Sequence, residues 1–328
     1  MNFIGIDVAK AKLDCCLLLE AEGTKRKSKV MPNTPEGFQQ LIQWCEKKGF
    51  SPSRLHVVME GTGCYHQPAA HAFFQAGMRV SVANPARVKQ FGQALGILTK
   101  NDGIDAFVLA RFGALTKPSL WFPPPPEVQH LQALLARKDA IGNDLRREKN
   151  RLEKTDFTAV PKSVMNSLRQ HIAFLEKVLK NLSEDIDAYI DQNPNLKENR
   201  DWLQTIPGVG DVLGVNMLAL LSRGGFDSAE QLAAYLGIIP IEKQSGSSLK
   251  GRPHLSKNGP AKMRAKLYMP AIVAIRHNPH IKAMAQRMAQ KGKCKMFIIG
   301  AAMRKLAHLC FGVFKNRCPY QPDCAISS

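Results

Sequence analysis

The chain has 328 residues, 45% of them hydrophobic, and its 46 Lys and Arg residues outnumber 27 Asp and Glu residues to give a net charge of +19. This length and this apolar content allow two or three folded domains and exclude a largely disordered chain. No apolar stretch approaches the length expected of a membrane span, and no signal peptide precedes the first strand. The sequence therefore predicts a cytoplasmic protein without membrane contact, whose cysteines are free thiols.

The first third of the chain alternates between predicted strands and predicted helices. Thr34-Pro35-Glu36 supplies a cap, a first-turn proline and an early acid for the first helix. The expected strands cover 2–8, 13–19, 24–31, 55–60 and 78–82, and the expected helices cover 35–48 and 66–76. Three strands followed by alternating helix and strand predict an α/β domain of the ribonuclease-H-like fold.

Four carboxylates in this region are candidates for a shared site. Asp7 and Glu60 each interrupt an apolar strand, which places an acid at the edge of a sheet. Asp102 and Asp105 open a helical pattern, and their i,i+3 spacing sets both on one face. Taken singly, each acid is equally compatible with a helix cap or a solvated strand end. Together they predict an oxygen-only site for Mg²⁺ or Mn²⁺, where two ions could clamp the reacting oxygens of a phosphodiester.

A proline run, 123–126, marks a domain boundary. We expect the ribonuclease-H-like domain over 1–122, a helical coiled-coil domain over 127–195 and a basic, mostly α domain over 196–328. The middle segment has an apolar seam with alternating four- and three-residue steps, formed by Leu168, Ile172, Leu175, Leu179, Leu182, Ile186 and Ile190. A helical hairpin with its corner at Pro161 and a contact between two protomers explain this seam equally well.

The C-terminal part is strongly basic, with seventeen Lys and Arg residues and no Asp or Glu between Lys243 and Pro322. This segregation of charge indicates a nucleic-acid partner. A merely solvated basic face explains it less well. The turn 206–210 resembles a helix-hairpin-helix, whose helix start can hold a phosphate, although packing alone also explains such a turn. Nucleic-acid contacts are expected from Gly208, Gly210, Lys250, Arg252, Lys257, Lys262 and Arg264.

A segment rich in Ser and Gly, residues 244–252, lies inside this basic run. Small residues permit close approach of a phosphate, which Lys250 and Arg252 could neutralise. A serine beside such cations could attack phosphorus and form a covalent link to DNA. On local chemistry alone a flexible polar loop is the better interpretation, and nothing selects among Ser245, Ser247 and Ser248.

Six motifs follow one another along nearly the whole chain. They are Gly5-Ile6-Asp7-Val8-Ala9-Lys10, Glu60-Gly61-Thr62-Gly63-Cys64-Tyr65, Asn84-Pro85, Asp102-Gly103-Ile104-Asp105-Ala106, Ile206-Pro207-Gly208-Val209-Gly210, and Ser245-Gly246-Ser247-Ser248 with Arg252 and Leu267-Tyr268. This series resembles the DEDD-type insertion-sequence transposases, the bridge-RNA-guided recombinases with a Holliday-resolvase-like (RuvC-like) N-terminal domain. Asn101 stands where that family often has Thr or Ser, and Gly61 stands where it usually has Ala. Neither departure removes a ligand.

The resemblance implies roles for individual residues and partners. Asp7, Glu60, Asp102 and Asp105 are expected to hold Mg²⁺, and Ser245 is expected to be the nucleophile. The carboxylates of one protomer would meet the serine of another, in a dimer that assembles to a tetramer. A structured non-coding bridge RNA would guide the enzyme to both donor and target double-stranded DNA.

Other functions remain open at this point. A metal-dependent endonuclease could hydrolyse DNA junctions with water and use the basic part only for grip, and a decayed nuclease fold could bind nucleic acid without chemistry. The intact carboxylate set argues against the second. The sequence has no Gly-x-x-x-x-Gly-Lys-Ser/Thr loop for ATP. It also has no His-x-x-Arg to activate a tyrosine nucleophile, and no Gly-rich phosphate turn of an actin-like kinase follows Asp7.

Overall fold

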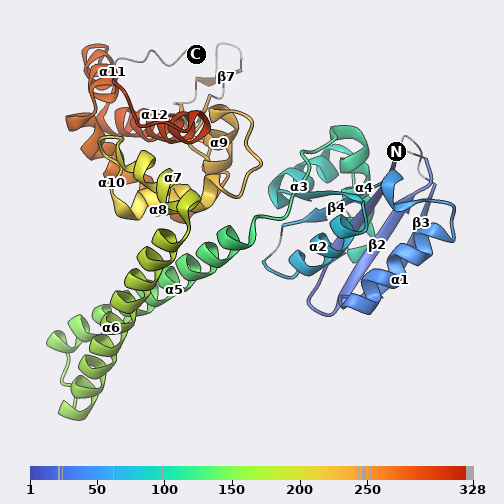
Figure 1. The fold of residues 1–328 in the computed structure, drawn as a ribbon, viewed down its shortest axis with the longest axis horizontal. Coiled ribbons are helices and arrows are strands. Elements are labelled where there is room, and N and C mark those ends of the chain that lie inside the picture. The colour runs from blue at the N-terminus through green and yellow to red at the C-terminus, as the bar shows by residue number, and fades with distance from the viewer. Residues whose placement is uncertain are drawn as a thin grey trace. The chain divides into compact units, whose positions relative to one another are not determined.

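The computed structural model describes residues 1–20, 23, 25–61, 63–97, 99, 101–242, 244–245, 249–250 and 253–322, with the backbone alone at 244–245 and 249–250. The chain folds into two compact units, unit 1 (Met1–Pro123) and unit 2 (Pro124–Ser328), which are described separately (Figure 1). The polyproline segment of the sequence lies where the two units divide.

Unit 1 is built on a five-stranded sheet with the order β3-β2-β1-β4-β5. Its strands are β1 (Asn2–Val8), β2 (Lys12–Leu18), β3 (Arg26–Pro32), β4 (Leu55–Glu60) and β5 (Arg79–Ala83). The first three strands pair antiparallel, whereas β4 runs parallel to β1 and β5 runs parallel to β4. This topology confirms the ribonuclease-H-like fold expected from the order of the elements.

Helices cover both faces of this sheet. They are α1 (Pro35–Glu46), α2 (Gln67–Gln75), α3 (Pro85–Ala94) and α4 (Asp102–Thr116), with a short 3₁₀ helix at Pro52–Arg54. Phe38 of α1 and Phe73 of α2 share one core with Ile6 of β1. Val108 and Phe112 of α4 pack in a second core on the opposite face. The sheet is therefore buried on both sides, which accounts for the continuous apolar runs in β1 and β4.

The approach of α4 to the sheet depends on Gly5. A methyl group at this position would lie 2.0 Å from the carbonyl oxygen of Ala106 and 2.3 Å from the amide nitrogen of Ala110. Those backbone atoms belong to the middle of α4, so no side-chain rotation could relieve the clash. Gly5 is therefore required because it lets the helix backbone rest directly on β1.

Unit 2 is mostly helical. Its elements are α5 (Pro126–Lys154), a 3₁₀ turn at Thr155–Phe157, α6 (Lys162–Gln192), α7 (Pro194–Gln204), α8 (Asp211–Leu221), α9 (Ala229–Leu236), α10 (Ala261–His277), α11 (Pro279–Gln290) and α12 (Lys295–Asn316). Two short strand pairs join β6 (Pro240–Ile241) to β9 (His254–Leu255) and β7 (Gln244–Ser245) to β8 (Leu249–Lys250).

The long helices α5 and α6 pack together as an antiparallel hairpin (Figure 1). Pro161 caps the start of α6, at the corner where the sequence predicts it. Four residues of the apolar seam, Ile172, Leu175, Ile186 and Ile190, are buried within the single chain. Packing of the hairpin on itself therefore accounts for the seam, and the seam by itself no longer calls for a second protomer.

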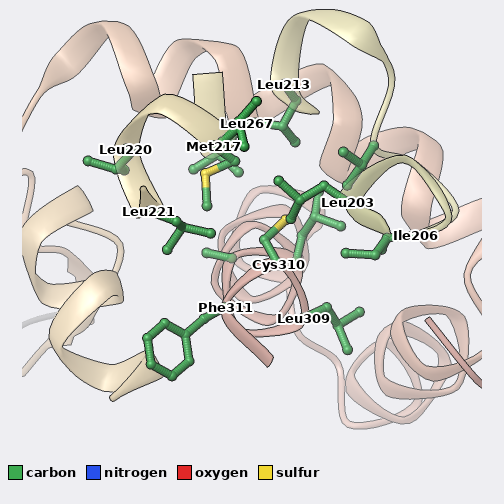
Figure 2. Close-up of a cluster of buried hydrophobic side chains, with 14 of the residues drawn as sticks. Leu203, Ile206, Leu213, Met217, Leu220, Leu221, Leu267, Leu309, Cys310 and Phe311 are labelled. Carbon is green, nitrogen blue, oxygen red and sulfur yellow. The ribbon is translucent and has the colours of Figure 1, made fainter. Parts of the chain in front are cut away.

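Helix α12 is the centre of the core of unit 2. Figure 2 shows Leu309, Cys310 and Phe311 of this helix among buried side chains of α7, α8 and α10. The helix has 22 residues, and by length and composition it is long and apolar enough to cross a membrane. The expectation that no stretch approaches such a length is therefore wrong. Half of the most apolar stretch of α12 is buried inside the structure, as in the core helix of a globular domain.

Replacing Gly5 with Ala should destabilise unit 1, because the added methyl group must push α4 off the sheet. Overpacking of this kind costs roughly 1–3 kcal/mol, and contact with backbone favours the upper end. Gly142 is the matched control, since it lies inside α5 with no atom near its would-be Cβ. Ala at position 142 should stabilise the chain by roughly 0.5–1 kcal/mol. Urea unfolding followed by circular dichroism measures both, and an unchanged midpoint for Gly5→Ala contradicts the required contact.

Candidate active site

Asp7 and Glu60 lie side by side at the end of two neighbouring parallel strands. The register of β1 and β4 pairs Ile6 with Met59, so the next residue of each strand is the acid. Because side chains alternate along a strand, Asp7 shares a face with Gly5, and Glu60 shares that face with Val58. This is the face that α4 covers. Both carboxylates therefore lie on the side of the sheet from which α4 approaches.

The first turn of α4 brings the other two candidate acids to this edge. Asn101 caps the helix, since its side-chain oxygen accepts a hydrogen bond from the amide of Ile104 at 2.9 Å. Asp102 and Asp105 follow in the first turn, where carboxylates also interact favourably with the helix dipole. The neighbouring Ala106 is the residue whose carbonyl oxygen touches β1 at Gly5. The contact at Gly5 thus fixes the distance between the acids of α4 and Asp7.

The electrostatics of Asp7 reflect this convergence. Burial raises the pKa of Asp7, and the charges of Asp102, Asp105 and Asp14 raise it further. A hydrogen bond from the backbone of Val8 opposes the shift only in part. The ionised form of Asp7 is therefore energetically unfavourable in the folded protein, and a nearby cation would stabilise it.

Two residues that the sequence reasoning missed belong to the same cluster. The register of β1 and β2 places Asp14 opposite Asp7. Lys12 on the same strand lies with its Nζ 2.6 Å from Asp102 Oδ2 and 3.0 Å from Asp14 Oδ2. The hydrogen bonds to Asp102 and then to Asp14 raise the pKa of Lys12. The alternation in Lys12-Leu13-Asp14 was the available signal, but it identifies the site only once the strand register is known.

Asn33 connects the two loops that follow the strand acids. Its side-chain nitrogen donates to the carbonyl oxygen of Ala9 at 2.9 Å and to that of Tyr65 at 3.2 Å. Ala9 lies two residues after Asp7, and Tyr65 lies five residues after Glu60. A single amide group therefore ties together the loops on which both acids depend.

The candidate carboxylates suit the expected metal in their chemistry but not in their present arrangement. Among the residues that the structure describes, no three His, Cys, Asp or Glu side chains are arranged closely enough to hold a metal ion. The donor set nevertheless fits Mg²⁺ or Mn²⁺ chemically, because every candidate ligand is a carboxylate oxygen. Burial first, and then the neighbouring charges of Asp102, Asp105 and Asp14, raise the pKa of Asp7, and a bound cation would oppose both effects. The Lys12 ammonium supplies one positive charge between Asp102 and Asp14, where an entering ion would compete with it.

The candidate residues of unit 2 are placed less completely. Gly208 and Gly210 lie in the turn between α7 and α8, as expected. Gly208 has a φ of 105°, and a Cβ there would lie 2.7 Å from the Cβ of Ala274 in α10. Packing against α10 therefore explains Gly208 without a phosphate. Gly210 precedes the first turn of α8 as its N-cap and has open space around it.

The cations expected to contact nucleic acid differ in exposure. Arg264 is partly buried, and its Nη1 donates to the carbonyl oxygens of Gly259 at 2.7 Å and of Leu236 at 3.2 Å. Lys257 and Lys262 are exposed. For Ser245 and Lys250 only the backbone is described, in the strand pair β7 and β8. Ser247, Ser248 and Arg252 lie outside the described residues.

Replacing Asp7 with Asn should stabilise the metal-free protein at neutral pH. A carboxyl whose pKa is raised in the folded state destabilises that state once it ionises, so the penalty appears as pH rises above the ordinary value of 3.8. The neutral amide of the variant would carry no such penalty, and its advantage should shrink as pH falls toward 3.8. Thermal melts in EDTA at several pH values measure this. Glu46→Gln, at an exposed carboxylate, is the control. A lower melting temperature for Asp7→Asn at pH 7 contradicts the argument.

Comparisons with known proteins cover most of the chain. Residues 4–155 match a DEDD-type family model described as "Transposase", and residues 200–286 match the model "Transposase IS116/IS110/IS902 family". The pilin gene-inverting protein of Moraxella bovis is 33% identical over 321 residues, which cover 97% of each chain. The protein of the same name from Moraxella lacunata is 32% identical over the same share of both chains.

Among solved structures, RuvC of Thermus thermophilus aligns with 35% of this chain and 93% of its own, at 18% identity and a TM-score of 0.27.

The two family models and the nearly full-length relatives agree with each other. The chain therefore belongs to the IS116/IS110/IS902 family of insertion-sequence transposases.

Proposed function

We propose that this chain is an RNA-guided DNA recombinase, which cleaves and exchanges strands between a donor element and a target through a serine–DNA link. The observation that carries the proposal is the convergence of Asp7, Glu60 and the first turn of α4 on one edge of the sheet. Membership of a transposase family supports DNA recombination as the reaction class. The full-length similarity to gene-inverting proteins supports it as well.

The proposed chemistry divides the work between the two units. Asp7, Glu60, Asp102 and Asp105 would hold Mg²⁺ or Mn²⁺, which when bound polarises the scissile phosphate. The Ser245 hydroxyl oxygen would attack phosphorus as its proton passes to a base, and the bond from phosphorus to one deoxyribose oxygen would break. The free deoxyribose hydroxyl of another strand would then attack the phosphoserine and restore a phosphodiester. Each step exchanges one phosphate ester for another, so rejoining needs no ATP.

Membership of the family and the positive charge of the chain support the proposed partners. A structured non-coding RNA encoded with the element would pair with donor and target DNA, while the protein grips backbones with the basic run. If the acids of one protomer act with the serine of another, the working enzyme is at least a dimer, and a tetramer holds two DNA duplexes. We propose that this assembly acts in the cytoplasm at the nucleoid.

A second function, hydrolysis of DNA junctions, is favoured by the same carboxylate cluster if unit 2 serves only for grip. Both functions need the acids, but hydrolysis by water leaves no covalent protein–DNA adduct. The serine is therefore the residue that separates the two.

Glu60→Gln and Asp102→Asn should each abolish Mg²⁺-dependent DNA cleavage and leave nucleic-acid binding within about twofold of the wild type. The reason is that the acids serve the metal and the chemistry, whereas the cations of unit 2 serve affinity. Cleavage of labelled DNA carrying an element end and gel-shift titrations of the same DNA measure the two effects. Glu46→Gln, at an exposed position at the end of α1, is the control for charge loss. Substantial cleavage by both site variants contradicts the assignment.

Ser245→Ala should abolish the covalent adduct, while Ser247→Ala and Ser248→Ala should slow the reaction without ending it. The three serines lie in one short segment of the sequence, so the neighbours control for any other effect of a substitution in that segment. Denaturing electrophoresis of end-labelled DNA after reaction detects an adduct by its retarded, protease-sensitive band. An adduct that persists in Ser245→Ala excludes this nucleophile. Wild-type cleavage without any adduct favours hydrolysis.

A further inference from the structure

A shallow groove between α5 and α10 has no assigned role. Its volume is about 530 Å³, and its lining residues are Ala140, Asn143, Asp144, Arg146, Arg147, Asn150 and Lys262. The first six come from α5, which precedes the acid-free run of the sequence, and Lys262 stands in the first turn of α10. The groove therefore adds residues of α5 to the basic surface, which the composition of the sequence assigns only to the acid-free run.

The two walls of the groove are held in place by an ion pair. Lys266 lies one turn after Lys262, and its Nζ is 2.8 Å from Oδ1 and 3.0 Å from Oδ2 of Asp139 on α5. The same ammonium donates to Asn216 on α8 at 2.7 Å. Only 18% of the Lys266 side chain is exposed, so this contact is shielded from solvent. The start of α10 is thereby fixed against α5, and the groove is part of the packed structure.

The groove carries uncompensated positive charge. Arg147 forms an ion pair with Asp144, which lies in the same lining. Arg146 donates to the neutral side-chain oxygen of Asn143 at 2.8 Å. Within the described part of the chain, neither Arg146 nor Lys262 has a carboxylate partner. Three cations and one carboxylate leave two positive charges beside the amide groups of Asn143 and Asn150.

This combination suits a polynucleotide backbone. A guanidinium fork and an ammonium bind phosphate oxygens, and the two amides can bond to neighbouring sugar or phosphate oxygens. The lining contains no aromatic side chain on which a base could stack. The groove is also open and polar, so it offers no enclosed pocket for a single nucleotide. These features favour contacts that read the backbone and not the base sequence.

We propose that the α5–α10 groove is a binding site for the sugar-phosphate backbone of a nucleic acid. This inference rests on the proposed nucleic-acid chemistry, and it adds Asn143, Arg146 and Asn150 of α5 to Lys262, the groove residue that belongs to the acid-free run. RNA and DNA present the same phosphates, so the test uses both. A nucleic-acid backbone bound there would contact α5 of the hairpin on one side and the first turn of α10 on the other.

The experiment compares Arg146→Gln/Lys262→Gln with Arg169→Gln/Lys177→Gln, which removes the same charge from exposed positions on α6. Fluorescence anisotropy measures binding of labelled duplex DNA and of a labelled RNA hairpin over a range of KCl concentrations. The groove variant should bind roughly thirtyfold more weakly, because the two lost charged contacts together are worth about 2 kcal/mol. For duplex DNA its salt slope should fall by about 1.8, since each phosphate contributes about 0.9. The control should bind like the wild type.

A second variant, Asn150→Asp, adds a carboxylate to the groove without removing a cation and should also weaken binding. Circular dichroism and melting temperature establish that all variants are folded. The polymer whose affinity falls identifies the occupant as RNA, DNA or both. Wild-type affinity and slope in a folded groove variant, or equal losses in the control, overturn the groove assignment. A wild-type protein that binds neither polymer instead overturns the proposed function.

Discussion

The close contact between β1 and α4 at Gly5 is the constraint on which the candidate active site depends. A side chain at this position would collide with backbone atoms of Ala106 and Ala110, so the helix can rest on the strand only where glycine stands. Asp7 lies two residues along β1 from the contact, and Asp105 lies one residue before Ala106. The same contact that fills the core thus sets the spacing between carboxylates from two elements nearly a hundred residues apart.

This arrangement brings like charges together, and the protein offsets them only in part. Asp7 is held partly buried within the fields of Asp102, Asp105 and Asp14, which raises its pKa. Lys12 bridges Asp102 and Asp14 with one ammonium group. The carboxylates gathered at this edge of the sheet repel DNA phosphates, and an entering cation would reduce that repulsion. The electrostatics therefore favour a divalent ion as part of any phosphodiester chemistry at this edge.

The sequence predicted the sheet of unit 1 closely, because its strands and helices carry strong local signals. The cap and first-turn proline at Thr34 and Pro35 confirm this for α1. The helix at 85–94 was not predicted, although Asn84 caps it and Pro85 begins it, since only Val88 and Phe91 among its ten residues are large and apolar. Lys12 and Asp14 were missed for a different reason. Their role depends on the register that places Asp14 opposite Asp7, and strand register is a property of tertiary pairing.

The seam of α6 and the apolar helix α12 show where sequence patterns are ambiguous in themselves. Heptad-like spacing is explained either by packing within the chain or by contact with a second protomer. A long apolar helix is explained either by burial in a core or by insertion into a membrane. In this chain α5 covers the seam, and a helical core surrounds much of α12. Periodicity identifies which face of a helix must be buried, but it does not identify the partner.

The contacts of the partly buried cations in unit 2 show how an acid-free run of sequence can pack in a folded domain. Where a cation of the acid-free run packs internally, its partner comes from outside the run, as Asp139 on α5 does for Lys266. His308 on α12 likewise lies 3.9 Å from Glu230 on α9. Arg264 uses backbone carbonyls instead. Carboxylates from other segments thus pair with Lys266 and His308, and backbone carbonyl groups bind Arg264. A surface of this kind favours a polyanion, and Lys262 adds the charge of the run to that of Arg146 and Arg147 in the α5–α10 groove.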